Sequence, residues 1–268
     1  MLLCANSNIC RIEELKRLGY DAIDVGFTRV IYNNDPYPHD PILDNDNWQA
    51  DLDPYIEKCK EIGLKISSTH LPYRYDHTDP KGDKFDFFHG MAIRSLQASE
   101  YLGAKWTVMH LINVNGTVEY AKKLFADSGV KKIGIAIEND PRLSLDELIE
   151  AHDTLKNEGY NVGICLDVGH CHINTKHENN VPDVIRQMGE RIKVLHIHDN
   201  CRNLDMHKAP FTGTMDWNGV MCALKDIKFT GEFNFELQPE RIPEPARLAY
   251  EKYCVDIGRY LISLYDKE

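Results

Sequence analysis

In this 268-residue chain, side chains of the metal-binding types recur at one kind of position, the end of a short apolar run. In chain order they are His70, His110, Glu138, Asp167, His170, His196, His198, Asp205, His207 and Glu236. Imidazole nitrogens and carboxylate oxygens are ligands that proteins commonly offer to divalent metals. If the ends of the runs meet in space, these residues would form a centre able to polarise a substrate oxygen.

Eight such runs occur along the chain, and an amphipathic stretch of helical periodicity follows each of them. They span residues 2–5, 22–26, 64–70, 106–111, 133–138, 162–168, 192–198 and 232–237. Strands that alternate with helices form parallel βαβ units, and eight units are typical of a TIM (β/α)8 barrel. A doubly wound open sheet is disfavoured because no GxGxxG turn follows the first run. We therefore expect an α/β protein with a single TIM barrel domain over residues 1–268.

Local signals mark the ends of several expected helices. Asp53 followed by Pro54 is typical of an N-cap and a first helical position, and Ser144 with Glu147 has the pattern of a capping box. Glycines expected to follow helix C-termini are Gly19, Gly63, Gly103 and Gly159. The last helix is expected to share one face among Ala249, Tyr253, Ile257, Leu261 and Leu264.

Strand alternation indicates which candidate ligands point into the barrel. Residues two apart share a face, so in the run 133–138 the three isoleucines face outward and Glu138 faces the interior. The same alternation turns Asp167 and Glu236 inward. Three carboxylates in one cavity would repel one another, and a divalent cation between them keeps all three charged. We therefore expect these carboxylates and His196, all at the C-terminal face of the barrel, to hold a metal.

Three further histidines remain open at this point. His70 and His110 end the third and fourth runs, where they could act either as a second set of ligands or as substrate contacts. His198 shares the inward parity of His196, and its role is not assigned.

The strings around these residues resemble the xylose-isomerase-like TIM barrels, a superfamily of sugar isomerases and epimerases that also includes enzymes of the endonuclease IV type. The resemblance covers nearly the whole chain and rests on Ile137-Glu-Asn139, Leu166-Asp-Val-Gly-His170, Val194-Leu-His-Ile-His-Asp199, Asp205-x-His207 with Gly213-x-x-Asp-Trp217, and Phe235-Glu236. In the isomerase and epimerase branch it implies one divalent ion (Zn, Mn, Mg or Co) on Glu138, Asp167, His196 and Glu236. It also implies that His170 and Arg202 contact substrate oxygens.

The endonuclease branch implies a different centre, in which nine ligands hold three zinc ions. Residues of the right type stand at all nine matching positions: His70, His110, Glu138, Asp167, His170, His196, Asp205, His207 and Glu236. Two neighbours depart from that branch, because Gly169 stands where a cysteine is typical and His198 where an asparagine is typical. A three-zinc phosphodiesterase acting on abasic DNA is therefore the alternative and not the first choice.

The charge distribution favours a small polar substrate over nucleic acid. The chain carries 31 Lys and Arg against 42 Asp and Glu, a formal net charge of −11. The loop expected after the second strand, residues 27–47, holds four aspartates against one basic residue, Arg29. A DNA-binding face would gather Lys and Arg where the phosphates lie.

Sequence features also indicate where the protein works. No apolar run approaches the roughly 18 residues of a membrane span, and the first residues lack the pattern of a signal peptide. The eight cysteines are scattered without a CxxC pair, as expected for thiols in a reducing compartment. We expect a cytoplasmic protein without membrane contact, and a homo-oligomer stays possible.

Taken with the resemblance, these features predict a metal-dependent isomerase or epimerase of a sugar, either a ketose or aldose or a sugar phosphate. The metal would bind a carbonyl and a neighbouring hydroxyl of the sugar and stabilise an enediolate. Glu138 and Glu236, on opposite sides of the cavity, would serve as acid and base. A dehydratase acting on a related polyol would use the same chemistry. A non-catalytic sugar-binding barrel is a further alternative, against which the pair of glutamates argues.

Overall fold

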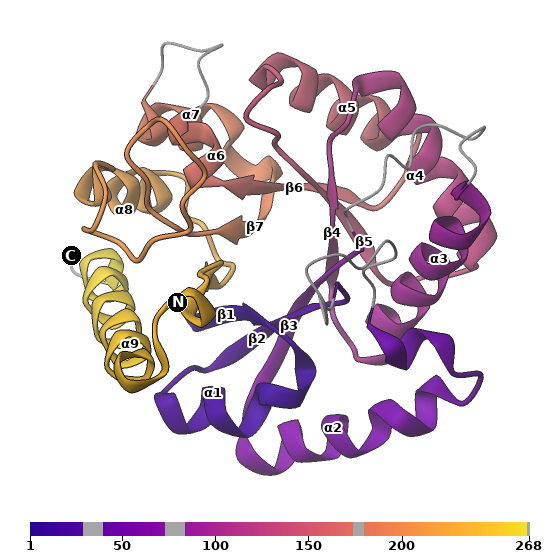
Figure 1. Ribbon diagram of the computed structural model, residues 1–268. Helices are drawn as coiled ribbons and strands as arrows, with labels where there is room; N and C mark the ends of the chain where they lie inside the picture. The colour runs from indigo at the N-terminus through magenta and orange to yellow at the C-terminus, as the bar shows by residue number, and fades with distance from the viewer. Residues whose placement is uncertain (29–39, 73–83, 174–179, 267–268) are drawn as a thin grey trace.

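The computed structural model describes residues 1–28, 40–72, 84–173 and 180–266. Within these ranges eight strands form one parallel sheet in the order β7-β6-β5-β4-β3-β2-β1-β8, curled into a nearly closed barrel with helices outside it (Figure 1). The strands are β1 Leu3–Ser7, β2 Ala22–Gly26, β3 Lys65–His70, β4 Trp106–His110, β5 Gly134–Glu138, β6 Val162–Asp167, β7 Ile192–His196 and β8 Phe233–Phe235. The TIM barrel is therefore confirmed, and each strand overlaps its predicted range.

The barrel closes between β7 and β8 through a short seam. A parallel bridge pairs Ile197 with Phe235. The backbone N–H of Ile197 donates to the carbonyl of Asn234 at 2.9 Å, and that of Glu236 donates to the carbonyl of Ile197 at 3.2 Å. Because β8 has only three residues, few backbone contacts fix the end of β7 relative to Glu236.

Helices cover the outer face of the sheet. They are α1 Ile12–Leu18, α2 Trp48–Ile62, α3 Phe85–Tyr101, α4 Val114–Ser128, α5 Leu145–Asn157, α6 Val168–Ile173, α7 Val181–Met188, α8 Trp217–Asp226 and α9 Glu244–Asp266. Short 3-10 turns lie at η1 Ile9–Arg11, η2 Pro41–Asp44, η3 Gly189–Arg191 and η4 Pro239–Arg241. Among the described residues, no helix has the length and apolar content needed to cross a membrane.

The core has two parts, as strand alternation predicts. The outward side chains of β5, Ile135 and Ile137, belong to the large core between the sheet and the helices. The barrel interior holds a small separate cluster of Val108, Ala136, Cys165 and Val194, with Trp106 beside it. The inward parity of β5 and β6 is therefore confirmed, and it carries Glu138 and Asp167 to the mouth of the barrel.

Several predicted helix ends are confirmed. The Ser144 side chain accepts from the Glu147 backbone N–H at 3.2 Å while the Glu147 carboxylate accepts from the Ser144 N–H at 2.7 Å, which is a complete capping box. The four glycines predicted to follow helices adopt the left-handed backbone: Gly19, Gly63, Gly103 and Gly159. These positions favour glycine because a β-carbon there is strained.

The predicted start of α2 at Asp53 and Pro54 is wrong. The helix begins at Trp48, one and a half turns earlier, and contains Pro54 in its interior. Trp48 and Leu52 lie four residues apart and are both buried, so the early turns bury apolar surface. Pro54 removes the hydrogen bond to the carbonyl of Ala50, but both residues are exposed and water can satisfy that carbonyl.

The predicted face of α9 is right only in part. Leu261 is buried and Ile257 and Leu264 are half-buried against the core, whereas Ala249 and Tyr253 are exposed. The buried stripe is Glu251, Cys254, Val255, Gly258, Leu261 and Ile262. Gly258 packs directly on the barrel, since a β-carbon there would lie 2.6 Å from Leu3 Cδ1. A search for apolar residues at helical spacing leaves out glycines and charged residues. It therefore misses Gly258 and also Glu251, whose Oε1 lies 2.6 Å from Nη2 of Arg11.

Part of the acidic loop after β2 lies outside the described residues, namely 29–39 with Arg29 and Asp35. Asp40, which follows it, is buried and accepts a hydrogen bond from Asn8 Nδ2 at 2.9 Å.

Candidate metal centre

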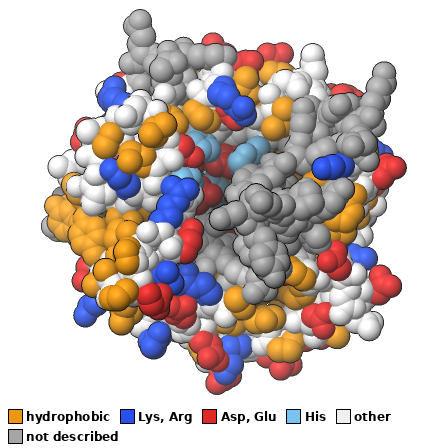
Figure 2. Space-filling view, in the orientation of Figure 1, with side chains coloured by type: hydrophobic (Ala, Val, Ile, Leu, Met, Phe, Trp, Pro, Cys, Tyr) orange, Lys and Arg blue, Asp and Glu red, His pale blue; other side chains and the backbone are white. Residues whose placement is uncertain are grey.

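The strand ends bring the candidate ligands to one face of the barrel. Parallel register pairs His110 with Glu138 across β4 and β5, and Asp167 with His196 across β6 and β7. Figure 2 shows histidine and acidic side chains at the bottom of a hollow in the centre of this face. The sequence-based expectation that the ends of the runs meet is therefore confirmed.

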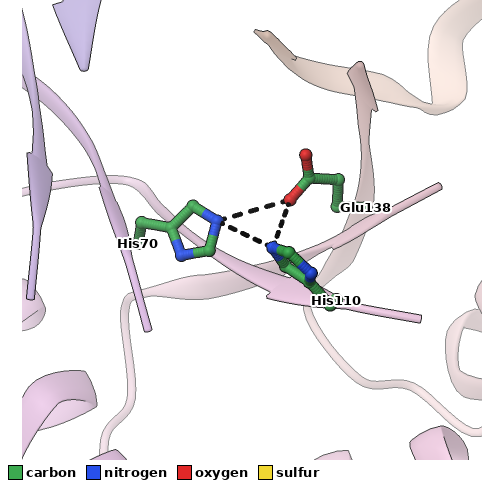
Figure 3. A group of neighbouring side chains, drawn as sticks. All are labelled: His70, His110 and Glu138. Carbon is green, nitrogen blue, oxygen red and sulfur yellow. Dashed lines mark hydrogen bonds and ion pairs between the residues drawn. The ribbon is translucent and has the colours of Figure 1, made fainter. Parts of the chain in front are cut away.

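His70, His110 and Glu138 form the first part of the centre (Figure 3). Oε2 of Glu138 lies 3.0 Å from Nε2 of His110 and 3.3 Å from Nε2 of His70. The two Nε2 atoms are 3.2 Å apart. Glu138 is 2 % exposed, so its charge must be balanced within the site and not by solvent.

His196 and Glu236 complete this set, which we call the Glu138 group. Nδ1 of His196 lies 2.9 Å from Oε1 of Glu138 and 3.2 Å from Oε2 of Glu236. The His196 ring also stacks on His70, with 5.6 Å between ring centroids. Two carboxylates therefore converge on one buried imidazole nitrogen.

A second set, which we call the Asp167 group, lies beside the first and comprises Asp167, His170, His198, Asp205 and His207. Nε2 of His198 is 3.0 Å from Oδ1 of Asp167. Asp205 Oδ2 lies 3.0 Å from Nε2 of His207 and 3.5 Å from Nε2 of His170. Of the four ligands predicted for one metal, the structure thus gathers three in the Glu138 group and turns Asp167 toward His198.

Three histidines are oriented by backbone carbonyls. Nδ1 of His70 donates to the carbonyl of Leu71 at 2.8 Å. Likewise, Nδ1 of His170 donates to the carbonyl of Asn139 at 2.9 Å, and Nδ1 of His207 donates to the carbonyl of Glu236 at 2.9 Å. A neutral ring held in this way presents the lone pair of Nε2 to the site, which is how metal-binding histidines are commonly supported.

These orientations fit a divalent metal. Nε2 of His70 lies 3.3 Å from a carboxylate oxygen of Glu138 and 3.2 Å from Nε2 of His110. Such contacts are favourable only with a proton or a metal ion between the atoms. Imidazole nitrogen and carboxylate oxygen together suit zinc, manganese or cobalt. The residues present therefore fit the metal that the sequence predicts.

Burial and the neighbouring imidazoles act in opposite directions on the two glutamates. Burial alone would raise the pKa of Glu138, but the charges of His110 and His196 lower it well below its usual value. The pKa of Glu236 is likewise raised by burial, but His196 and His207 together lower it below its usual value. Both glutamates are therefore ionised at neutral pH.

Sequence reasoning missed two residues that support the centre. Asn139 binds the backbone of Asp167 twice, accepting from its N–H at 2.8 Å and donating to its carbonyl at 3.0 Å. Asp24, on β2, is fully buried in the barrel interior and lies 3.3 Å from Nε2 of His196. The inward parity it shares with Ala22 is the signal that could have identified Asp24.

Arg202, expected to contact substrate oxygens, is not part of either group. It is exposed and has a positive φ of 67°, and its backbone N–H donates to Oδ1 of Asn200. Among the described residues, its guanidinium makes no hydrogen bond or ion pair with the centre.

A cleft of about 1110 Å3 opens above the centre. Its inner wall includes His70, His110, Glu138, His170, His207 and Glu236. Its outer part includes Arg11 and Arg241. This volume lies just above the roughly 300–1,000 Å3 typical of small-molecule sites.

Comparisons with known proteins agree with the fold. Residues 12–252 match the family described as xylose isomerase-like TIM barrel. A D-tagatose 3-epimerase-like protein is 16% identical with a TM-score of 0.72, over 99% of this chain and 98% of that one. The 3-keto-D-glucoside 4-epimerase YcjR from E. coli is 16% identical with a TM-score of 0.69, over 97% and 99%. The IolI protein with a binding zinc atom is 18% identical with a TM-score of 0.71, over 99% and 98%.

A curated relative matches only a part of the chain. It is the uncharacterized protein y4fM of Sinorhizobium fredii (strain NBRC 101917 / NGR234), 34% identical over 80 residues. The match covers 30% of this chain and 25% of that protein, so the chain spans about a quarter of the relative's length.

Proposed function

The chain belongs to the xylose isomerase-like TIM barrel family, and from that premise we propose that it is a divalent-metal-dependent isomerase or epimerase of a small sugar. The observation that carries the proposal is the convergence of Glu138 and Glu236 on Nδ1 of His196, at 2.9 and 3.2 Å. Solved structures of the same fold that are named as sugar epimerases support the substrate class. We assign the whole chain, residues 1–268, to this one domain.

Glu138, His196 and Glu236 would hold the metal, with Asp167 of the neighbouring group as the fourth ligand. A bound divalent ion would polarise a substrate carbonyl and offset the negative charge that develops when a neighbouring carbon loses a proton. Asn139 keeps the backbone of Asp167 in place through two hydrogen bonds. The backbone carbonyls behind the histidines keep their Nε2 atoms directed at the site.

The two glutamates would move the proton. Both are ionised at neutral pH, and the Glu236 side chain is 22 % exposed while that of Glu138 is 2 % exposed. Glu236 therefore has freer access to a substrate in the cleft. If both carboxylates reach opposite faces of one carbon, the result is epimerisation. If one carboxylate carries the proton between adjacent carbons, the result is isomerisation. His170, which lines the cleft, would orient a substrate oxygen.

The second candidate is a three-zinc phosphodiesterase acting on abasic DNA. One observation favours it: two sets of three donors, His70 with His110 and Glu138, and His198 with Asp205 and His207, each lie within metal-binding reach. The net charge of −11 argues against a nucleic-acid substrate.

Metal content per chain separates the two candidates. Elemental analysis of protein purified without chelator should give about one divalent ion per chain for an isomerase or epimerase. We expect that ion to remain in His110→Ala and to be lost in Glu138→Gln. Three zinc ions, with loss on replacing His110, would instead favour the phosphodiesterase and would be followed by a cleavage assay on abasic DNA.

A sugar panel in D2O then tests the reaction itself. Proton transfer through a carboxylate exchanges with solvent, so a true substrate should gain deuterium at the reacting carbon by NMR. Product with an inverted or moved hydroxyl identifies an epimerase or an isomerase, and loss of water identifies the related dehydratase. Metal bound without exchange on any sugar tried would contradict catalysis and favour a sugar-binding barrel.

A further inference from the structure

Asp24 is a carboxylate held inside the barrel below the Glu138 group. It is fully buried on β2, and its Oδ2 accepts hydrogen bonds from Asn6 Nδ2 at 2.9 Å and Asn234 Nδ2 at 3.0 Å. Its Oδ1 has no hydrogen-bond partner among the described residues. A buried carboxylate is costly unless it is compensated, and two neutral amides compensate it only in part. Its presence therefore calls for a further partner.

That partner is His196. Nε2 of His196 lies 3.3 Å from Oδ2 of Asp24 as an ion pair, and both side chains are fully buried. Nε2 makes no hydrogen bond of good geometry within the described part of the chain. The opposite ring nitrogen, Nδ1, faces Glu138 and Glu236. A carboxylate behind one imidazole nitrogen determines that this nitrogen carries the hydrogen, which leaves the other nitrogen free to bind a metal.

Asp24 also acts across the seam of the barrel. His196 ends β7, whereas Asn234 lies on β8, and few backbone contacts join these two strands. Asp24 Oδ2 contacts both side chains. Asn234 has the same strand parity as Glu236, so fixing Asn234 also fixes the strand that carries Glu236. Oδ2 of Asp24 therefore contacts side chains of both β7 and β8, the strands that place His196 and Glu236 next to each other.

We propose that Asp24 is a positioning residue of the metal centre, which orients His196 so that Nδ1 meets the metal and which holds β7 and β8 in register for Glu236. The inference rests on the proposed function, because it requires a metal in the Glu138 group. Asp24 would not touch the metal or the substrate. Carboxylates in this position behind a metal-binding histidine affect metal affinity by roughly 10- to 100-fold.

The test compares zinc affinity in Asp24→Asn and in the unaltered protein, by calorimetric titration of chelator-treated samples. The amide keeps the size of the side chain but removes its charge. Thr107→Val is the matched control, since Thr107 is fully buried and its Oγ1 has no hydrogen-bond partner among the described residues. We expect affinity to fall roughly 10- to 100-fold in Asp24→Asn and to stay unchanged in Thr107→Val.

Equal zinc affinity in Asp24→Asn and the unaltered protein would overturn the inference and leave the proposed function intact. Failure of the unaltered protein to bind any of zinc, manganese, magnesium or cobalt would instead overturn the proposed function. The Co2+-loaded forms give an independent readout, because a reoriented His196 should change the visible absorption of the bound ion. An unchanged spectrum in Asp24→Asn would contradict the inference.

A measurement on the unaltered protein covers the case in which Asp24→Asn does not fold. In the zinc-loaded state, NMR of 15N-labelled histidine should show His196 with its hydrogen on Nε2, the resonance being identified by its loss in His196→Gln. A hydrogen on Nδ1 would mean that the metal binds Nε2, on the side of Asp24, and would overturn the inference.

Discussion

His198 packs onto the backbone of Gly169 so closely that a β-carbon at residue 169 would stand 1.9 Å from Cε1 of the imidazole. The His198 ring is fully buried and stacks on His207 with 4.2 Å between centroids. These are the two positions at which the sequence departs from the endonuclease pattern. The absence of a side chain at Gly169 makes room for the His198 ring.

Gly169→Ala is expected to destabilise the protein by roughly 1–3 kcal/mol, because a buried ring between Asp167 and Asp205 has to move. Gly90→Ala is the matched control, since it lies within α3 and its added β-carbon meets nothing within 4 Å. Gly90→Ala should raise the free energy of unfolding by up to about 1 kcal/mol. Urea unfolding measures both, and a similar gain in the two variants would contradict the tight packing of His198.

Removal of metal is expected to lower thermal stability. Binding to the folded state alone contributes about 2.7 kcal/mol at a hundredfold excess over Kd, which for a chain of this size raises Tm by roughly 5–10 °C. The Tm of chelator-treated protein should rise by this amount when zinc or manganese is added back. The Tm of chelator-treated His196→Gln should rise much less on the same addition. A Tm that ignores every divalent ion tested would contradict a metal centre.

Asp199 is expected to be the most important single side chain of the β7–α8 loop, which carries Asp205 and His207. It is fully buried and accepts hydrogen bonds from Trp217 Nε1 at 2.9 Å and from the backbone N–H of Gly213 at 3.0 Å. Asp199→Ala leaves these donors unpaired and should cost about 3 kcal/mol or more. Trp217→Phe removes one of the donors and should cost less. Denaturant unfolding measures the loss of stability in Asp199→Ala and in Trp217→Phe. A larger loss in Trp217→Phe would contradict this role of Asp199.

The ion pair of Asp153 with Arg191 predicts a small acid-dependent stability. Its two hydrogen bonds, both 3.0 Å, lower the pKa of Asp153 to about 2, against the opposing effect of burial and with a smaller contribution from His152. The pKa of Asp153 in the folded state lies below the unfolded value of about 3.9. The contribution of this pair to the free energy of unfolding is therefore complete above about pH 4 and is lost as pH falls toward 2.

The matching experiment compares Asp153→Asn with the unaltered protein at pH 7 and near pH 2.5. The difference at pH 7 should be below about 1 kcal/mol, since the pair is partly exposed, and it should shrink at the lower pH. Asp256→Asn, on the exposed side of α9, controls for the loss of one negative charge. A difference that grows in acid would contradict the assigned sign.

The sequence alone was sufficient to predict the barrel and the face that holds the centre. Periodicity of two in each apolar run reports which side chains point inward, and it placed Glu138 and Asp167 correctly without any knowledge of neighbours. The order of strands and helices then required the strand ends to meet. Both features depend on local spacing, which a sequence displays directly.

The partners across the barrel could be decided only by the tertiary structure. Parity shows that Asp167 points inward but not that it turns to His198, because that contact depends on the room left by Gly169. It likewise shows nothing of Asp24 beneath His196, since the two residues lie far apart in sequence and on strands that do not pair. Side-chain distances between such strands depend on barrel closure and on packing in three dimensions, and neither can be predicted from local periodicity.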